Sequence, residues 1–302
     1  MNTKIYSKID QLPNGAADNN IVEGCIVLEG GAFRGVYGEG VLDALMQNGI
    51  NFSCTIGVSA GAMNGMNYVS GDIGRSARTN LRYRHDPRYV GFTALRNNYG
   101  VIGFDFVFGQ LNQIDPLNQE RFWDTRRRFI AVATNCITGC PEYFEKSTCS
   151  DIFKAIQASA SMPYVSRMVM LDGQPYLDGG CSKSIPYEWA LQHKFSKIVV
   201  IRTRQEEFRK PDKINKAAFM CYGKHPAFAK VLSEANREYN RECDEIQKLF
   251  RQGRLMVIAP SKPIHAGRLE GDMEKLGEIY ELGYQDGLNA VNQLKIYLEL
   301  DN

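Results

Sequence analysis

Residues 25–35 read CIVLEGGAFRG, and within them an apolar run changes abruptly into a glycine-rich loop. Gly24–Glu29 is a short and mostly apolar segment, which is typical of a buried strand. Residues 36–47 follow the loop with apolar side chains at helical spacing, and Asn48-Gly49 ends that pattern. Because glycine lacks a Cβ, the three glycines of the loop allow a ligand or a second main chain to come close. The stretch predicts a strand, a tight loop and a helix.

A second strand and helix follow directly in the chain. Phe52–Val58 reads as a strand, and Ala60–Tyr68 reads as a helix of small residues that Ser70-Gly71 closes. A strand–helix–strand unit of this length implies two parallel strands with a right-handed crossover. If the two strands are neighbours, the loops that follow them open at the same carboxyl edge of the sheet, where ligand sites of α/β proteins lie.

The same alternation continues along the chain. The further predicted strands are residues 129–134, 197–202 and 254–259, with a hairpin over 167–177 that turns at Asp172-Gly173. The further predicted helices are residues 151–158, 226–250 and 273–298. Strands that alternate with helices in this way predict a layered α/β fold.

The chain is expected to form one domain. Its 302 residues suffice for one large domain or two small ones, and no stretch rich in proline, serine or glycine marks a boundary. Residues 1–20 are polar and lack the apolar centre of a signal peptide, so we expect an N-terminal arm there. Residues 21–302 then form the domain, with a motif-bearing core at about 24–190 and a C-terminal part of helices and strands at 191–302.

Composition excludes several classes of function. A formal net charge of +2 gives no strong basic field that would indicate a nucleic-acid partner. The sequence contains no run of 18 or more apolar residues, so we expect no transmembrane helix. The four histidines are far apart and the eight cysteines include no CxxC pair, so we expect neither a metal site nor a cofactor. Unpaired cysteines are typical of a reducing compartment, which favours a cytoplasmic location.

The motif that most directly indicates a catalytic residue is G-x-S-x-G at Gly57, Ser59 and Gly61. An apolar strand enters it and a helix of small residues leaves it, which is the setting of a nucleophile elbow. Glycine on either side of the serine lets the strand and helix backbones approach each other. The serine would sit at a helix N-terminus, whose free N–H groups favour a developing negative charge. A glycine-rich turn with a solvent-exposed serine is the alternative.

A serine hydroxyl is a poor nucleophile without a base. His193, His225 and His265 follow it in the chain, and His265 is the most plausible of them because it lies on a predicted loop. None has a flanking pattern that would hold it in place. Asp178 in Leu177-Asp178-Gly179-Gly180 is the better partner, since two glycines let its carboxylate approach another main chain. An ordinary Asp-Gly-Gly turn is the alternative.

The Gly30–Gly35 loop then acquires a candidate role. A serine that attacks an ester creates an oxyanion, and N–H groups of a glycine-rich turn can stabilise that charge. Arg34 either adds positive charge near the site or forms a structural ion pair. A nucleotide-binding loop fits less well, because no Gly-Lys-Ser/Thr ending follows and Ala32 stands where G-x-G-x-x-G needs its middle glycine.

Together the three motifs resemble those of the patatin-like phospholipase family, in the family's order and across residues 24–186. The family has an oxyanion loop of the form G-G-G-x-R/K-G, a G-x-S-x-G elbow and an Asp-Gly-Gly or Asp-Gly-Ala motif. The residues that match are Gly30, Gly31, Ala32, Phe33, Arg34 and Gly35, then Gly57, Ser59 and Gly61, and finally Asp178, Gly179 and Gly180. The run Ala158–Pro163 (ASASMP) is also similar to a small-residue run of the family. Ala32 departs from the glycine of the loop but keeps its N–H.

The resemblance implies a three-layer α/β/α fold with a mostly parallel central sheet. It implies a lipid acyl hydrolase, of phospholipase A or esterase type, in which Ser59 and Asp178 form a dyad without a catalytic histidine. An acyl-enzyme would form on Ser59, and N–H groups of the Gly31–Arg34 loop would hold the oxyanion. The alternatives are a Ser–Asp–His esterase that uses His265, a lipid acyltransferase, and a non-catalytic lipid-binding module.

The expected partner is a lipid or another acyl ester, and the sequence carries no signal for an oligomeric state. Tyr99–Leu111 is apolar and aromatic, and a loop that covers the core is favoured over a lipid-facing flap. Basic residues after Ala217 are typical of a solvated helix face. Transient contact with a membrane surface stays open as an expectation.

Overall fold

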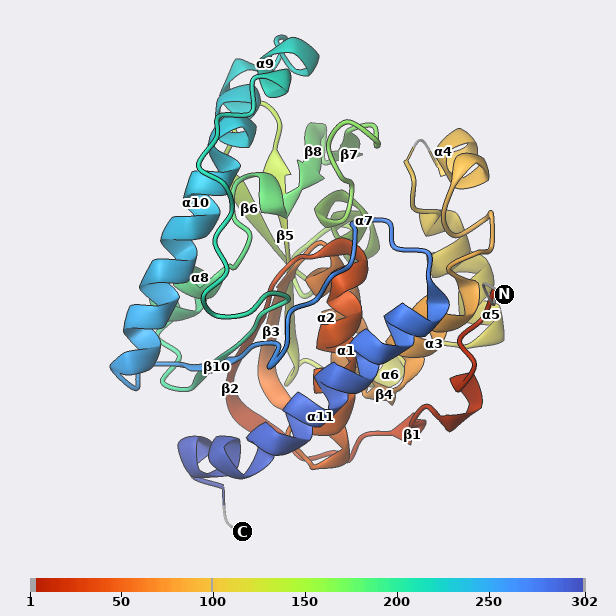
Figure 1. Ribbon diagram of the computed structural model, residues 1–302, viewed down its shortest axis with the longest axis vertical. Coiled ribbons are helices and arrows are strands. Elements are labelled where there is room, and N and C mark those ends of the chain that lie inside the picture. The colour runs from red at the N-terminus through yellow and green to blue at the C-terminus, as the bar shows by residue number, and fades with distance from the viewer. Residues whose placement is uncertain (1–3, 99, 301–302) are drawn as a thin grey trace.

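A mostly parallel β-sheet forms the centre of the computed structural model, which describes residues 4–98 and 100–300 (Figure 1). The sheet has the strand order β10-β9-β2-β3-β5-β8-β7, and β6 also pairs with β5. The strands from β10 to β5 are parallel, whereas β6, β7 and β8 pair antiparallel. The strands are β2 (Val22–Leu28), β3 (Phe52–Val58), β5 (Arg128–Asn135), β6 (Pro141–Glu145), β7 (Val169–Leu171), β8 (Gln174–Asp178), β9 (Ile198–Ile201) and β10 (Met256–Ile258). The predicted α/β class is confirmed.

Helices cover both faces of the sheet, because its strands bury side chains on both sides. In β2, Ile26 and Leu28 join one apolar cluster, whereas Cys25 and Val27 join another. The helices on the first face are α1 (Val36–Gln47), α2 (Ala60–Ser70), α7 (Ile152–Ser159) and α11 (Met273–Leu298), and those on the second are α8 (Tyr187–Gln192) and α10 (Pro226–Arg251). The period-two alternation of each strand thus produces three layers.

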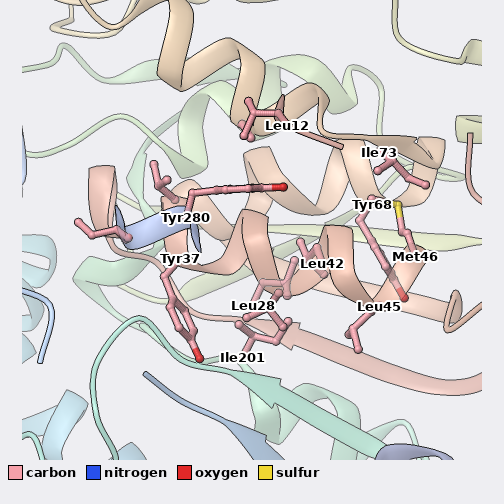
Figure 2. Packing of buried hydrophobic residues seen from close by; sticks show 14 of the residues in the cluster. Leu12, Leu28, Tyr37, Leu42, Leu45, Met46, Tyr68, Ile73, Ile201 and Tyr280 are labelled. Carbon is pink, nitrogen blue, oxygen red and sulfur yellow. The ribbon is translucent and has the colours of Figure 1, made fainter. Parts of the chain in front are cut away.

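Helices α1 and α11 pack closely because glycines lie where they meet. A Cβ at Gly40 would lie 2.2 Å from the carbonyl oxygen of Tyr280, and a Cβ at Gly283 would lie 1.9 Å from that of Tyr37. Figure 2 shows Tyr37 and Tyr280 among the buried side chains between these helices and Ile201 of the sheet. The C-terminal helix is therefore part of the same core as the first strand and helix.

Short elements surround this frame, and several were not predicted. Helix α3 has the mostly polar sequence RSARTNLRY and buries only Ala77 and Leu81 in the apolar core. Its buried Arg75 also donates to Asn67 and to the main chain of Asp115. The short elements are η1 (Ile9–Gln11), β1 (Gly15–Ala16), η2 (Ala32–Gly35), β4 (Asp72–Ile73), α3 (Arg75–Tyr83), α4 (Phe92–Asn98), η3 (Phe106–Gln110), α5 (Leu111–Ile114), α6 (Gln119–Phe122), η4 (Gly179–Cys181) and α9 (Ala217–Cys221). Within the described ranges, no helix combines the length and apolarity needed to cross a bilayer.

The described part of the expected N-terminal arm, residues 4–20, lies against the rest of the chain. Tyr6 is buried, and its hydroxyl donates to Glu281 of α11 at 2.6 Å. Leu12 and Ala17 are buried as well. Strands β9 and β10 join the central sheet, so we propose that residues 21–302 form one domain.

The apolar segment at 99–111 covers the core, with Tyr99 outside the described residues. Phe104, Phe106 and Val107 are buried, and the Phe106 ring packs against Tyr83 at a centroid distance of 5.5 Å. Residues 106–114 are helical (η3 and α5) instead of forming the expected loop. Burial of these large side chains against neighbouring helices explains the regular structure.

Candidate active site

A strained turn joins β3 to α2, and Ser59 occupies it. Ser59 has a φ of 56° and a ψ of −122°, a combination that a residue other than glycine adopts only when its surroundings impose it. A Cβ at Gly57 would lie 2.4 Å from the carbonyl oxygen of Gly61, and a Cβ at Gly61 would lie 2.5 Å from that of Leu28. Both glycines of the motif are thus required by the close approach of strand, helix and neighbouring strand, as an elbow needs.

The sheet brings the end of β8 to this turn. Val132 of β5 pairs with Val58 of β3 on one edge and with β6 on the other. The next residue, Ala133, pairs with Asp178 of β8, while β6 again occupies its other edge. Strands β3 and β8 therefore share one edge of β5 and approach each other from opposite directions. Their carboxyl ends meet at Val132 and Ala133, which places Asp178 beside Ser59.

Ser59 and Asp178 are in direct contact. The Ser59 hydroxyl donates to Oδ2 of Asp178 at 2.8 Å, and the N–H of Gly180 donates to Oδ1 at 2.8 Å. Burial raises the pKa of Asp178 above its ordinary value, while the two hydrogen bonds and the charges of Arg268 and Lys210 act to lower it. The arrangement is a serine hydroxyl hydrogen-bonded to a desolvated carboxylate, which can accept its proton.

The histidines are placed elsewhere. His193 stacks on Trp189, and His225 is the residue that precedes helix α10. His265 is exposed on the loop between β10 and α11. Among the described residues, those that line the two cavities at Ser59 include no histidine. The structure therefore brings Ser59 together with Asp178 and not with His265.

Two further polar residues hold this arrangement, and their roles were not predicted. Ser159 is fully buried, accepts from the N–H of Ser59 at 2.8 Å and donates to the carbonyl oxygen of Val132 at 2.6 Å. The hydroxyl of Thr134 donates to the carbonyl oxygen of Asp178 at 2.9 Å. Ser159 belongs to the small-residue run 158–163, which was the available signal, but the run alone does not reveal what its hydroxyl contacts.

The glycine-rich loop lies against the elbow. A Cβ at Gly30 would lie 3.1 Å from the Cβ of Ser59, and one at Gly35 would lie 2.6 Å from the Cβ of Ala60. Residues 32–35 form the short helix η2, and Ala32 begins it with a φ of 48°. These contacts place the loop and the serine side by side at the carboxyl edge of the sheet.

Only part of this loop has free N–H donors. The N–H of Arg34 donates to the carbonyl oxygen of Gly31 at 3.1 Å, and that of Phe33 donates to the carbonyl oxygen of Arg268 at 3.4 Å. For Gly31 and Ala32, the described residues provide no acceptor for the main-chain N–H. The predicted donor set of Gly31 to Arg34 therefore narrows to its first two members, because the helical turn uses the N–H of Arg34 and the carbonyl oxygen of Arg268 uses that of Phe33.

Arg34 follows the free donors and faces the cavity above Asp178. Burial, with the charge of Arg204, lowers the pKa of Arg34 to about 10. Its Nε is buried without a hydrogen-bond partner, and the described residues place no carboxylate within 4.0 Å of its guanidinium. Of the two roles predicted for Arg34, the described structure shows the positive charge near the site and not the ion pair.

A comparison with family models decides the family. A model described as "Patatin-like phospholipase" matches residues 26–191, which is more than half of the chain and includes all three motifs. The chain belongs to the patatin-like phospholipase family. At the level of this family it is a lipid acyl hydrolase. A second model, described as "Domain of unknown function (DUF6363)", matches residues 225–299.

Individual proteins similar to this patatin-like chain include one bacterial and one viral relative. "Uncharacterized protein YjjU" of Escherichia coli K12 is 28% identical over 265 residues, covering 85% of this chain and 74% of the relative. "Probable lipid hydrolase 463L" of Invertebrate iridescent virus 6 is 28% identical over 189 residues, covering 56% of this chain and 63% of the relative. Among solved structures, VipD from Legionella pneumophila aligns with a TM-score of 0.47 and 13% identity, covering 90% of this chain and 67% of VipD.

Two cavities meet at Ser59 of this patatin-like chain. The first is mainly apolar and extends between α2, α3 and the 102–107 segment, with Met63, Met66 and Phe104 in its wall. The second lies over Asp178 and carries polar and charged side chains. Within the described residues, no cluster of three or more histidine, cysteine or acidic side chains could hold a metal ion. The serine therefore stands between an apolar space and a polar one.

Proposed function

We propose that the protein hydrolyses carboxylic esters of lipids through Ser59 as nucleophile and Asp178 as general base. The observation that carries the proposal is the 2.8 Å hydrogen bond from Ser59 Oγ to Asp178 Oδ2 in a buried setting. The acyl chain would occupy the apolar cavity, and the alcohol part would occupy the polar one. The viral relative named as a probable lipid hydrolase supports hydrolysis as the reaction.

The proposed reaction has two halves. Ser59 Oγ attacks the acyl carbonyl carbon, its proton passes to Asp178, and the N–H groups of Gly31 and Ala32 stabilise the oxyanion. The alcohol leaves with the proton from Asp178, and the acyl group stays on Ser59. Water then attacks the acyl-enzyme and gives its proton to Asp178. The fatty acid leaves as Ser59 recovers its proton.

A carboxylate is a weaker base than the imidazole of a usual triad. The difference between ordinary aspartate and histidine pKa values is about 2.5 units, or about 3.4 kcal/mol. Burial of Asp178 raises its pKa and reduces this difference. One well-placed oxyanion donor contributes about 3 to 4 kcal/mol, so two free N–H groups in the loop are sufficient to offset the remainder.

The proposal is tested by labelling and turnover together. A fluorophosphonate probe should label the wild type at Ser59 and leave Ser59→Ala unlabelled, as read by mass spectrometry. The wild type should also release free fatty acid from p-nitrophenyl butyrate and from glycerophospholipids. A folded wild type that neither labels nor turns over any ester would indicate a binding module instead. Transfer of the acyl group to added glycerol in preference to water would indicate an acyltransferase.

The pH dependence should show a base whose pKa lies above that of an ordinary aspartate. Asp178 can accept a proton only when ionised, and burial favours its protonated form. The value of kcat/KM for a neutral soluble ester should therefore be low in acid and rise through a midpoint above about pH 4. The measurement is the pH profile of kcat/KM, which reports the free enzyme. A rate that is independent of pH across this limb, or that falls as the pH rises through it, would contradict the assignment.

A further inference from the structure

The polar cavity over Asp178 is lined by an excess of cationic side chains. Arg34, Lys210, Lys213 and Arg268 line it, and among the described residues Asp178 is the only carboxylate in its wall. Arg34 belongs to the glycine-rich loop. Lys210 lies between β9 and α9, and Arg268 lies between β10 and α11, so segments that are distant in the sequence line one cavity.

None of these cations forms an ion pair within 4.0 Å in the part of the chain that the structure describes, although the charge of Asp178 acts on Lys210 and Arg268 from a greater distance. Seventeen ion pairs are found there, and none includes Arg34, Lys210, Lys213 or Arg268. The ammonium of Lys210 lies 3.8 Å from the centre of the Tyr239 ring instead. A buried guanidinium nitrogen without a partner, such as Nε of Arg34, is costly unless a ligand occupies the site.

Two carboxylates outside the cavity wall act on this cluster without forming an ion pair with it, and one of them, Glu29, also acts on Arg34. Glu29 and Glu242 act on Lys210 from a distance, but Glu29 accepts from the N–H of Thr203, and Glu242 lies 3.4 Å from Lys183. Burial lowers the pKa of Lys210, and the charges of Arg268 and Arg34 lower it further. The cations are therefore close enough to repel one another, and an anion between them would relieve that repulsion.

The chemistry of the site points to a phosphate group. Arginine and lysine side chains together are typical phosphate ligands, since guanidinium groups bind two oxygens at once and lysine adds a point charge. A glycerophospholipid carries its phosphate a few bonds from its ester carbonyls. An ester held at Ser59 can therefore place a phosphate in this cavity while an acyl chain enters the apolar one.

We propose that the preferred substrate is an acyl ester whose alcohol carries a net-negative phosphate headgroup, bound by Arg34, Lys210 and Arg268. This inference rests on the proposed hydrolase function. The cavity wall offers no second carboxylate that could pair with a choline or ethanolamine cation, so a headgroup without an ammonium is favoured. Lys210 and Arg268 lie outside residues 26–191, whereas Arg34 lies within them, so two of the three proposed phosphate ligands come from the C-terminal part of the chain.

The test compares phosphatidylglycerol with phosphatidylcholine of the same acyl chains, each diluted in neutral detergent micelles at fixed salt. We expect the wild type to favour phosphatidylglycerol in kcat/KM by about tenfold or more, because the choline cation of phosphatidylcholine would be repelled by the cavity cations and would find no carboxylate to pair with. The double variant Lys210→Met/Arg268→Met should bring this ratio close to one. Its turnover of p-nitrophenyl butyrate should fall much less than its turnover of phosphatidylglycerol.

A matched control removes two charges elsewhere. Lys224→Met/Lys262→Met changes exposed lysines that line neither cavity, and it should keep the wild-type ratio. An equal loss in this control would assign the preference to general attraction to the micelle and overturn the proposal. A wild-type ratio near one, or one that survives the cavity variant, would do the same.

Two other outcomes of this test can be distinguished from the expected one. Inhibition of p-nitrophenyl butyrate turnover by micromolar inorganic phosphate, with a lipid ratio near one, would assign the cations to free phosphate and overturn the lipid assignment. Failure of the wild type to cleave p-nitrophenyl butyrate or either lipid would count against the hydrolase function itself. Thermal unfolding of each variant shows whether the substitution has changed the fold instead of the site.

Discussion

Asp178→Asn should lower kcat/KM for a neutral soluble ester by at least about 10³-fold, because removal of a general base typically causes a loss of this size. The asparagine has nearly the same shape and can still accept from the N–H of Gly180, so the local fold is expected to persist. It cannot take the proton of Ser59, because its amide is not basic. Ser59→Ala should cause a comparable loss, since nucleophile and base act as one unit.

The matched control for this prediction is His265→Ala. That histidine is exposed and lies in neither cavity wall, so its replacement should leave kcat/KM within about twofold of the wild type. Steady-state kinetics on all three variants, with circular dichroism to verify folding, make the comparison. Abolished turnover in His265→Ala combined with a mild effect of Asp178→Asn would replace the dyad with a Ser–Asp–His arrangement.

Gly179→Ala should cost both stability and activity, although it adds a single methyl group. The new Cβ would lie 2.2 Å from the carbonyl oxygen of Val132 and 3.1 Å from Cγ1 of Val58. Val132 cannot retreat easily, because β5 is paired on both edges at this residue. We expect a loss of about 1 to 3 kcal/mol in the free energy of unfolding, as for other overpacked sites. Displacement of the adjacent Asp178 should lower kcat by about 10²-fold.

Gly267→Ala is the control, because no atom lies within 4 Å of a Cβ built there and its backbone needs no positive φ. It should change stability by less than about 0.5 kcal/mol. Urea unfolding and kcat for p-nitrophenyl butyrate measure the two effects. If Gly179→Ala behaves like Gly267→Ala in both assays, the tight junction between β8 and β5 does not govern the position of the carboxylate.

Several features of the candidate site were predictable because they are local. The elbow is one example, since the steric need for Gly57 arises within one strand–turn–helix unit, where its Cβ would meet Gly61. The steric need for Gly61 comes from the neighbouring strand at Leu28. The loop at 30–35 is another, because glycines after an apolar run predict a close approach whatever the partner is. The family follows from these motifs, and the comparison with family models confirms it.

Other features depend on contacts that no local pattern encodes. Ser159 bonds with the main chain of Ser59, but nothing in its own segment indicates that partner. The loop's donor set lost the N–H of Phe33, because this group donates to the carbonyl oxygen of Arg268, which is distant in the sequence. Helix α3 buries only two apolar side chains, Ala77 and Leu81, and the tertiary hydrogen bonds of the buried Arg75 add to their contribution. In each case a distant contact added to the local preference or changed its outcome.

The sequence by itself determined the turn at Ser59, the glycine loop, the aspartate motif and the α/β class, because short-range sterics and the period of apolar residues are written in neighbouring positions. Only the tertiary structure decided that Ser59 and Asp178, which are 119 positions apart, touch. That contact exists because β3 and β8 enter the same edge of β5 from opposite ends. Strand pairing of this kind is a property of the assembled sheet, and it also draws the cations of the C-terminal part to the cavity beside the serine.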